Sequence, residues 1–158
     1  MRIYTDASTR SNMSGLGYVA TTSKNIELTK SGIVIDQKDN NTAELLAIIY
    51  AIDDIQGLLQ ENEKLTIFTD STYAINAIRN NIYRQNEEPI VKKIQNLLEG
   101  NNYNLFHVKG HCQDGTILSY YNKRADKMSK VVRKQYEKDI KEQKKLKLLR
   151  HMKGKSKE

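Results

Sequence analysis

The chain has 158 residues, a formal net charge of +7 and 38% hydrophobic residues, which suits one domain with a sizeable buried core. No run approaches roughly 18 consecutive apolar residues, and no charged-then-apolar leader opens the chain, so we expect neither a membrane span nor a secretory signal. The single cysteine, Cys112, excludes an internal disulfide and favours a reducing, cytoplasmic location.

The basic excess is confined to the end of the chain. Residues 1–130 hold 15 basic and 15 acidic residues, whereas residues 131–158 hold 11 basic and 4 acidic residues. A neutral body with a basic tail is typical of proteins that bind a polyanion such as nucleic acid. A solvated charged helix that only aids solubility explains the charge equally well.

Hydrophobic periodicity predicts an alternation of strands and helices. In chain order we expect strands at 1–6, 16–22 and 26–35, a helix at 42–59, a strand at 65–70, helices at 71–80 and 89–100, a strand at 104–109 and a helix from Lys123. A polar turn is expected from Ala7 to Gly15 and a long loop from Gly110 to Asn122. The Lys-rich sequence beyond about residue 141 predicts disorder.

Two of the predicted strands end on the same dipeptide, Thr-Asp. Met1-Arg-Ile-Tyr-Thr-Asp6 and Leu65-Thr-Ile-Phe-Thr-Asp70 are both followed by small, hydroxylated residues. If these strands are parallel neighbours, about 4.8 Å apart, Asp6 and Asp70 emerge together at the carboxyl edge of the sheet, where ligands bind in α/β folds. Two adjacent carboxylates repel each other, and divalent cations relieve that repulsion. The structural alternative is that each aspartate only ends a strand or caps a helix, as Asp70 could before residues 71–80.

Glu44 lies in the first turn of the predicted helix at 42–59. With Asn41 as the N-cap, Glu44 falls at the position of an imperfect capping box. Alternatively, its side chain points towards Asp6 and Asp70 at the strand edge. Glu44 cannot close on its own cap and bind a metal at once, so both interpretations stay open at this level.

Five segments together resemble the type 1 ribonuclease H family in order, spacing and setting. They are Tyr-Thr-Asp6-Ala-Ser, Asn40-Asn-Thr-Ala-Glu44-Leu, Phe-Thr-Asp70-Ser, His107-Val-Lys-Gly-His111 and Asn122-Lys-Arg-Ala-Asp126. The resemblance implies an α/β, ribonuclease H-like fold: a five-stranded mixed sheet flanked by helices on both faces. It covers residues 1–135, which we take as the catalytic domain. Residues 136–158 are then a basic C-terminal extension, partly helical and then disordered.

The resemblance also implies an activity, namely hydrolysis of the RNA strand of RNA–DNA hybrids that leaves 5′-phosphate and 3′-hydroxyl ends. Two Mg²⁺ ions, or Mn²⁺ as an alternative, would be held by Asp6, Glu44, Asp70 and Asp126, the hard oxygen ligands that Mg²⁺ prefers. Glu44 would also contact the RNA 2′-hydroxyl. The family's loop histidine corresponds to His111, which would help proton transfer or product release.

Substrate contacts carry over from the family as well. Asn40 and Asn41 match asparagines that reach the minor groove, and the residues near the backbone-binding surface are Ser8, Asn12, Ser71 and Asn122. Each could instead be a turn former or a helix cap. The chain has no Trp, and its segment from Asn80 to Glu88 is too short for the basic protrusion of some members. We therefore hypothesise that the basic tail grips the substrate instead.

Other functions fit parts of this pattern. A Holliday-junction resolvase or transposase could use the same fold, because fold does not fix function. A non-catalytic nucleic-acid-binding module is a second alternative, although four carboxylates suit the binding of a polyanion poorly. The chain could also be the nuclease part of a larger polymerase, but its start and basic end favour a free-standing monomer without an obligate protein partner or a membrane.

Overall fold

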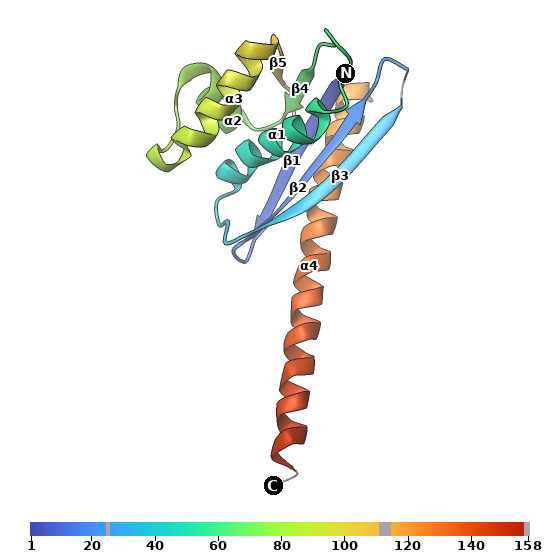
Figure 1. Ribbon diagram of the computed structural model, residues 1–158, viewed down its shortest axis with the longest axis vertical. Helices are drawn as coiled ribbons and strands as arrows, with labels where there is room; N and C mark the ends of the chain where they lie inside the picture. Colours follow the sequence, from blue (N-terminus) through green and yellow to red (C-terminus); the bar gives the residue numbers. More distant parts are fainter. Residues whose placement is uncertain (25, 111–114, 157–158) are drawn as a thin grey trace.

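The computed structural model describes residues 1–24, 26–110 and 115–156. Its centre is a five-stranded sheet in the order β3-β2-β1-β4-β5 (Figure 1). The strands are β1 (Arg2–Arg10), β2 (Met13–Thr21), β3 (Glu27–Ile35), β4 (Thr66–Thr69) and β5 (Asn104–His107). The first three pair antiparallel, whereas β4 pairs parallel with both β1 and β5. The sheet is therefore mixed, as predicted.

The first strand is longer than the sequence predicts. It continues past Asp6 to Arg10, and the predicted turn from Ala7 to Gly15 is mostly paired backbone in the β1–β2 ladder. The reversal needs only Ser11 and Asn12, which both have positive φ, at 52° and 63°, as a tight two-residue hairpin turn requires. The small hydroxylated residues that suggested a turn are instead strand residues at the end of the hairpin.

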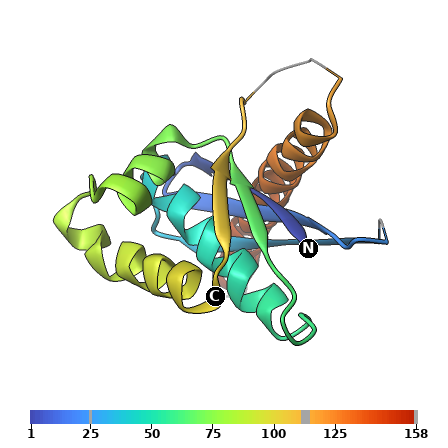
Figure 2. The same cartoon turned by 90° about the horizontal axis from the view of Figure 1, so that it is seen from above.

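Helices cover both faces of the sheet (Figure 2). They are α1 (Asn40–Gln56), α2 (Thr72–Asn80), α3 (Glu88–Asn101) and α4 (Ile117–Lys155), with a short 3₁₀ helix η1 (Gln85–Glu87) before α3. Alternate residues of β1 face opposite ways, as a strand dictates. Ile3 packs with α1, α2 and α3 in the main core, whereas Tyr4 packs with Ala125 and Met128 of α4. The five-stranded mixed sheet with helices on both faces (Figure 2), expected from the sequence, is confirmed.

The last helix differs from its prediction at both ends. It begins at Ile117, not Lys123, because Thr116 caps it by accepting a hydrogen bond from the Ser119 N–H at 3.1 Å. It also runs to Lys155, where disorder was predicted. The distal part contains no proline and is rich in Lys and Leu, which are good helix formers. The division of the chain at residue 135 stays a prediction.

No helix in the described part of the chain is both long enough and apolar enough to cross a membrane.

Candidate active site

Asp6 and Asp70 lie where two parallel strands part. The last β1–β4 pair is Thr5 with Thr69, after which β4 ends and Asp70 follows it directly. Asp6 comes next on β1, which continues paired with β2. Oxygen atoms of Asp6, Asp70 and Glu44 all lie within 4.8 Å of one another. The predicted meeting of the two Thr-Asp segments is thus present, although Asp6 does not end its strand.

Helix α1 brings Glu44 to this pair. The N-cap of α1 is Asp39, whose side chain accepts hydrogen bonds from the N–H groups of Asn41 and Thr42, so the predicted Asn41 cap is wrong. Glu44 is therefore not engaged in a capping box. Its Oε1 accepts long hydrogen bonds from the Ala7 N–H, at 3.4 Å, and from Asn40 Nδ2, at 3.5 Å. Its buried Oε2 has no hydrogen-bond partner among the described residues.

The cluster concentrates negative charge in a buried place. Asp6 is 4% exposed and Glu44 is 5% exposed. Burial raises the pKa of Asp6, and the nearby carboxylates of Glu44 and Asp70 raise it further. Burial also raises the pKa of Glu44. Without a cation, the site therefore resists holding all of its negative charges at neutral pH.

Asp126 approaches the cluster from the opposite face of the sheet. It lies on α4, and its Oδ2 accepts a hydrogen bond from Lys130 Nζ at 2.8 Å. The close approach of α4 depends on two glycines of β2. A Cβ at Gly15 would overlap the Ser129 carbonyl oxygen, and one at Gly17 would lie 3.0 Å from the Ala125 carbonyl oxygen. Since Gly17 pairs with Asp6 in the sheet, the helix crosses β2 beside the carboxylates.

Two neighbours hold Asp70 in place. Asn122 of α4 donates from Nδ2 to Asp70 Oδ2 at 3.3 Å, while its own Oδ1 is buried without a partner in the described structure. Gly110 packs so closely that a Cβ there would lie 2.8 Å from Asp70 Oδ2. Asn122, predicted to contact substrate, here orients a carboxylate. The part played by Gly110 was not predicted, although it lies inside the Lys-Gly-His motif.

Asp70 does not cap α2, which was the structural alternative for this residue. Ser71 is the N-cap of α2 and accepts a hydrogen bond from the Ala74 N–H at 3.0 Å. His111, the predicted catalytic histidine, lies outside the described residues. The strand histidine, His107, lies with its Nε2 3.2 Å from the Asp70 carbonyl oxygen.

A polar cavity of about 480 Å³ opens over the carboxylates. Its lining includes all four predicted metal ligands and four of the predicted substrate-contact residues, Ser8, Asn40, Asn41 and Ser71. Asn12 does not line it. Asn12 lies in the hairpin turn, six residues beyond Asp6, which corresponds to about 20 Å along a strand. Asn12 therefore lies away from the carboxylates, and its contact with substrate stays a prediction.

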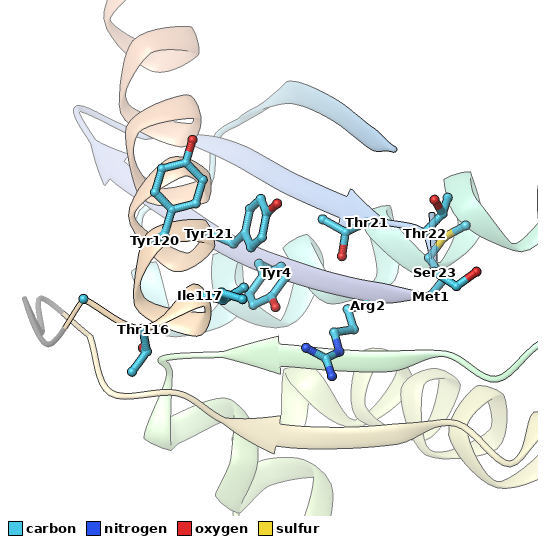
Figure 3. Close-up of a pocket in the computed structure, with 11 residues that line it drawn as sticks. Met1, Arg2, Tyr4, Thr21, Thr22, Ser23, Thr116, Ile117, Tyr120 and Tyr121 are labelled. Atoms are coloured by element: carbon cyan, nitrogen blue, oxygen red, sulfur yellow. The ribbon is translucent and has the colours of Figure 1, made fainter. Parts of the chain in front are cut away.

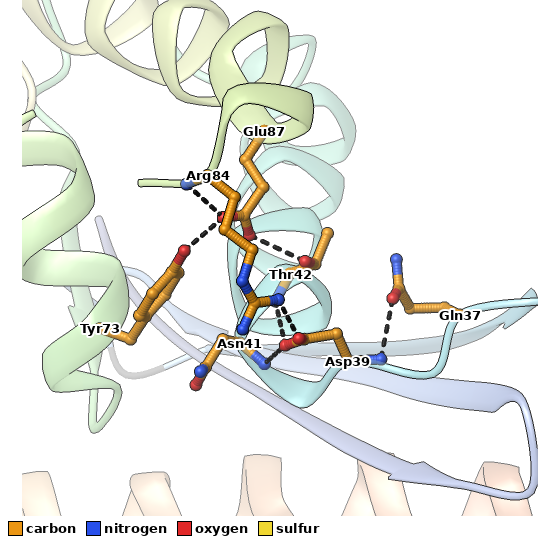
Figure 4. Close-up of polar contacts among 7 residues, drawn as sticks. All are labelled: Gln37, Asp39, Asn41, Thr42, Tyr73, Arg84 and Glu87. Atoms are coloured by element: carbon orange, nitrogen blue, oxygen red, sulfur yellow. Dashed lines mark hydrogen bonds and ion pairs between the residues drawn. The ribbon is translucent and has the colours of Figure 1, made fainter. Parts of the chain in front are cut away.

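One wall of this cavity is braced by a buried carboxylate, Glu87 (Figure 4). Glu87 is fully buried and accepts hydrogen bonds from the Tyr73 hydroxyl, from Thr42 Oγ1 at 2.8 Å and from the Arg84 N–H at 3.0 Å. The Arg84 guanidinium pairs with Asp39, the cap of α1. This network links η1 to the first turns of α1 and α2, from which Asn40, Asn41 and Tyr73 reach the cavity. No sequence pattern predicted this network.

A larger cavity, of about 810 Å³, lies at the amino end of β1 (Figure 3). It is lined by tyrosines and hydroxylated residues of β1, the β2 end and the start of α4, including Tyr4, Tyr120 and Tyr121. No carboxylate is among its described lining residues, and Arg2 is its charged side chain. By volume alone this cavity would be chosen as the candidate active site, but the carboxylate oxygens that could bind a cation line the smaller one.

Comparison with known proteins agrees with the geometry. The RNase H family model matches residues 1–153. LC11-RNase H1, isolated from compost by a metagenomic approach, aligns with a TM-score of 0.65 and 24% identity over 80% of this chain and 90% of its own. The same protein in complex with RNA/DNA hybrid aligns at 0.64, with 23% identity over 80% and 91% of the two chains.

RNase H1 from the halophilic archaeon Halobacterium salinarum aligns with a TM-score of 0.62 and 18% identity, over 82% of this chain and 93% of its own. No curated protein matches the chain. The likeness to the solved structures supports the fold, and the family model covers nearly the whole sequence. The chain therefore belongs to the RNase H family.

Proposed function

We propose that the protein is an endonuclease that hydrolyses the RNA strand of RNA–DNA hybrids and leaves 5′-phosphate and 3′-hydroxyl ends. The observation that carries the proposal is the convergence of Asp6, Glu44 and Asp70, from three separate elements, within 4.8 Å in a chain of the RNase H family. LC11-RNase H1, which has the same fold, has been solved in complex with RNA/DNA hybrid, and this supports the substrate class.

The donor set fits divalent cations. Carboxylate oxygens are the ligands that Mg²⁺ prefers, and the buried Oε2 of Glu44 offers a lone pair that no described residue uses. Asp6, Glu44, Asp70 and Asp126 would hold two Mg²⁺ ions, with Mn²⁺ as an alternative. When bound, such ions activate the attacking water and stabilise the leaving oxygen.

The chain's own residues would position these groups and the substrate. Asn122 and Gly110 fix Asp70, and the Glu87 network fixes the first turn of α1. Asn40 and Asn41 line the cavity beside Glu44, where they could reach the minor groove of a hybrid. A contact to the 2′-hydroxyl from this wall would distinguish RNA from DNA. A role for His111 in proton transfer, a monomeric state and a cytoplasmic location remain our predictions.

A substrate panel tests this proposal. The wild-type protein and Asp70→Asn are incubated in Mg²⁺ with a labelled RNA–DNA hybrid, double-stranded DNA, double-stranded RNA and a four-way junction. We expect cleavage of the RNA strand of the hybrid alone, and its loss in the variant. Cleavage of the junction would instead assign a resolvase, and binding without cleavage in either Mg²⁺ or Mn²⁺ would leave a nucleic-acid-binding module.

A further inference from the structure

Helix α4 continues far beyond the sheet that anchors it. Its last buried residue is Arg133, which donates from Nε to Ser8 Oγ at 2.9 Å and pairs with Glu137 at 2.8 Å. Residues 141–156 are all exposed. Figure 1 shows this distal part extending past the β1–β2 hairpin, roughly in the direction in which β1 runs towards the carboxyl edge of the sheet.

The helix face that packs on the sheet becomes a line of lysines. Steps of three and four residues keep side chains on one face of a helix. Such steps lead from the buried Ser129 and Arg133 through Ile140 to Lys144, Lys147 and Lys155. The face that carries Asp126 towards the carboxylates thus extends, beyond the body, as a basic surface.

The hairpin adds to this surface. Arg10, Ser11 and Met13 line a cavity of about 350 Å³ together with Glu137, Ile140, Lys141 and Lys144 of α4. Glu137 is paired with Arg133. Arg10 therefore lies on the same side of the molecule as the first distal lysines. The positive charge is contributed by two elements that are far apart in sequence.

The length of α4 sets the distance between this basic surface and the carboxylates. At about 1.5 Å per residue, Lys144 lies roughly 27 Å and Lys155 roughly 44 Å along the helix axis from Asp126. At about 3.4 Å per nucleotide along a duplex strand, these lengths correspond to roughly 8 to 13 base pairs. A duplex whose backbone follows the helix would thus meet the lysines about one helical turn from its contact with Asp126.

We infer that the distal part of α4, with Lys141, Lys144, Lys147 and the hairpin residue Arg10, is a second nucleic-acid-binding surface. It holds the phosphate backbone of the hybrid about one helical turn from the cleaved bond. The inference rests on the proposed function. Charge complementarity selects the occupant, because the whole basic excess of the chain lies in residues 131–158, while a cluster of carboxylates at the cleavage site would repel the substrate.

The test compares two variants with equal loss of charge. One is Lys141→Gln/Lys144→Gln/Lys147→Gln, and the control is Lys64→Gln/Lys92→Gln/Lys93→Gln, on the loop before β4 and on α3. KM is measured by cleavage in the wild-type background, and Kd by fluorescence anisotropy in the Asp70→Asn background. Hybrids of about 8 and about 24 base pairs are used between about 50 and 200 mM salt.

For the long hybrid, the distal variant should bind at least about tenfold more weakly at low salt. Between about 50 and 200 mM salt, its affinity should then fall by a factor about 10- to 40-fold smaller than that of the wild type, as expected for two or three lost phosphate contacts. For the short hybrid, and for the control variant, little should change. The kcat of the distal variant should equal that of the wild type.

Equal behaviour of the distal and control variants on the long hybrid would overturn the inference. If the wild type cleaves no hybrid, the proposed function fails, but the anisotropy data still test the surface. The exposed Leu146 and Leu149 offer an alternative occupant, a second copy of the chain. A dimer in sedimentation velocity that Leu146→Gln/Leu149→Gln dissociates would assign the helix to self-association and overturn the inference.

Discussion

In residues 117–133 of α4, small and polar side chains such as Ala125 and Ser129 pack against the sheet, whereas residues 141–156 have no buried side chain. The first part carries Asn122 and Asp126 to a cluster of carboxylates. The second part carries most of the basic excess of the chain. A single helix thus connects the acidic centre, which suits cations, with a basic surface, which suits a polyanion.

The difference between the two parts arises on the sheet. Gly15 and Gly17 leave room for the helix backbone beside β2, so that α4 lies close to the strand that carries Asp6. Beyond the hairpin there is no sheet to pack on, and long charged side chains remain solvated at little cost. Packing on the sheet therefore restricts which side chains residues 117–133 can carry. Residues 141–156 pack on nothing and can carry many charged side chains.

The largest effect on activity is expected from the removal of one central carboxylate. We expect Asp6→Asn to lower kcat by about 10²- to 10³-fold, as the loss of a group that stabilises charge in the transition state does. Asn has nearly the volume of Asp, so the fold should persist by circular dichroism. Asp53→Asn, at an exposed aspartate that pairs with Lys93, is the matched control. Nearly full activity in Asp6→Asn would contradict the assignment of the site.

Asn122→Ala tests whether the first part of α4 positions a carboxylate. Loss of the hydrogen bond from Asn122 to Asp70 should cost about 10- to 100-fold in activity or in Mg²⁺ affinity, the effect expected for a residue that orients a metal ligand. Calorimetric titration with Mg²⁺ would separate the two effects. If instead KM for the hybrid rises alone, Asn122 contacts substrate, as the sequence first suggested.

Gly15→Ala tests the packing that separates the two parts of the helix. The added methyl group would overlap the Ser129 carbonyl oxygen, so α4 must shift, at a cost of about 1–3 kcal/mol in the free energy of unfolding. Gly154→Ala, in the distal part, meets nothing within 4 Å and should be neutral or slightly stabilising. Urea denaturation of both variants checks this, and equal stabilities would show that the approach of α4 to β2 is not tight.

The pH dependence of stability gives an expected effect of similar size. Because the pKa values of Asp6 and Glu44 are raised in the folded state, their contribution to stability is full below the ordinary carboxyl pKa of about 4 and is lost as pH rises. The metal-free protein should therefore lose about 1–3 kcal/mol between about pH 4 and 8 relative to Asp6→Asn. Thermal melts in EDTA measure the loss, and Mg²⁺ should restore stability at pH 8. Parallel pH profiles for the two proteins would contradict this.

Local signals located the carboxyl end of β4, although not that of β1, and together with the family pattern they located the carboxylates. Thr-Asp after a β-branched run located Asp6 and Asp70, and the family pattern located Glu44 and Asp126. Contacts between residues far apart in the sequence could not be predicted. The close packing of Gly17 on Ala125 spans more than a hundred residues, and the burial of Glu87 depends on Tyr73, Thr42 and Arg84 meeting it in space.

Two differences from the sequence predictions have identifiable causes. The sequence alone leaves the β1–β2 register open, and that register puts Asn12 in the hairpin turn, away from the carboxylates. The end of the chain was expected to be disordered from its charge alone. The helix propensity of its Lys and Leu residues favours the helix that is observed.

The most direct test of the account measures both parts of α4 on one substrate. Steady-state cleavage of a long hybrid in Mg²⁺, at low and high salt, is compared for wild type, Asp126→Asn and the triple variant at Lys141, Lys144 and Lys147. We predict that Asp126→Asn lowers kcat and leaves the salt dependence of KM unchanged. The triple variant should raise KM, weaken its salt dependence and leave kcat unchanged. If both variants altered the same parameter, the helix would not separate catalysis from substrate binding, and the account would be wrong.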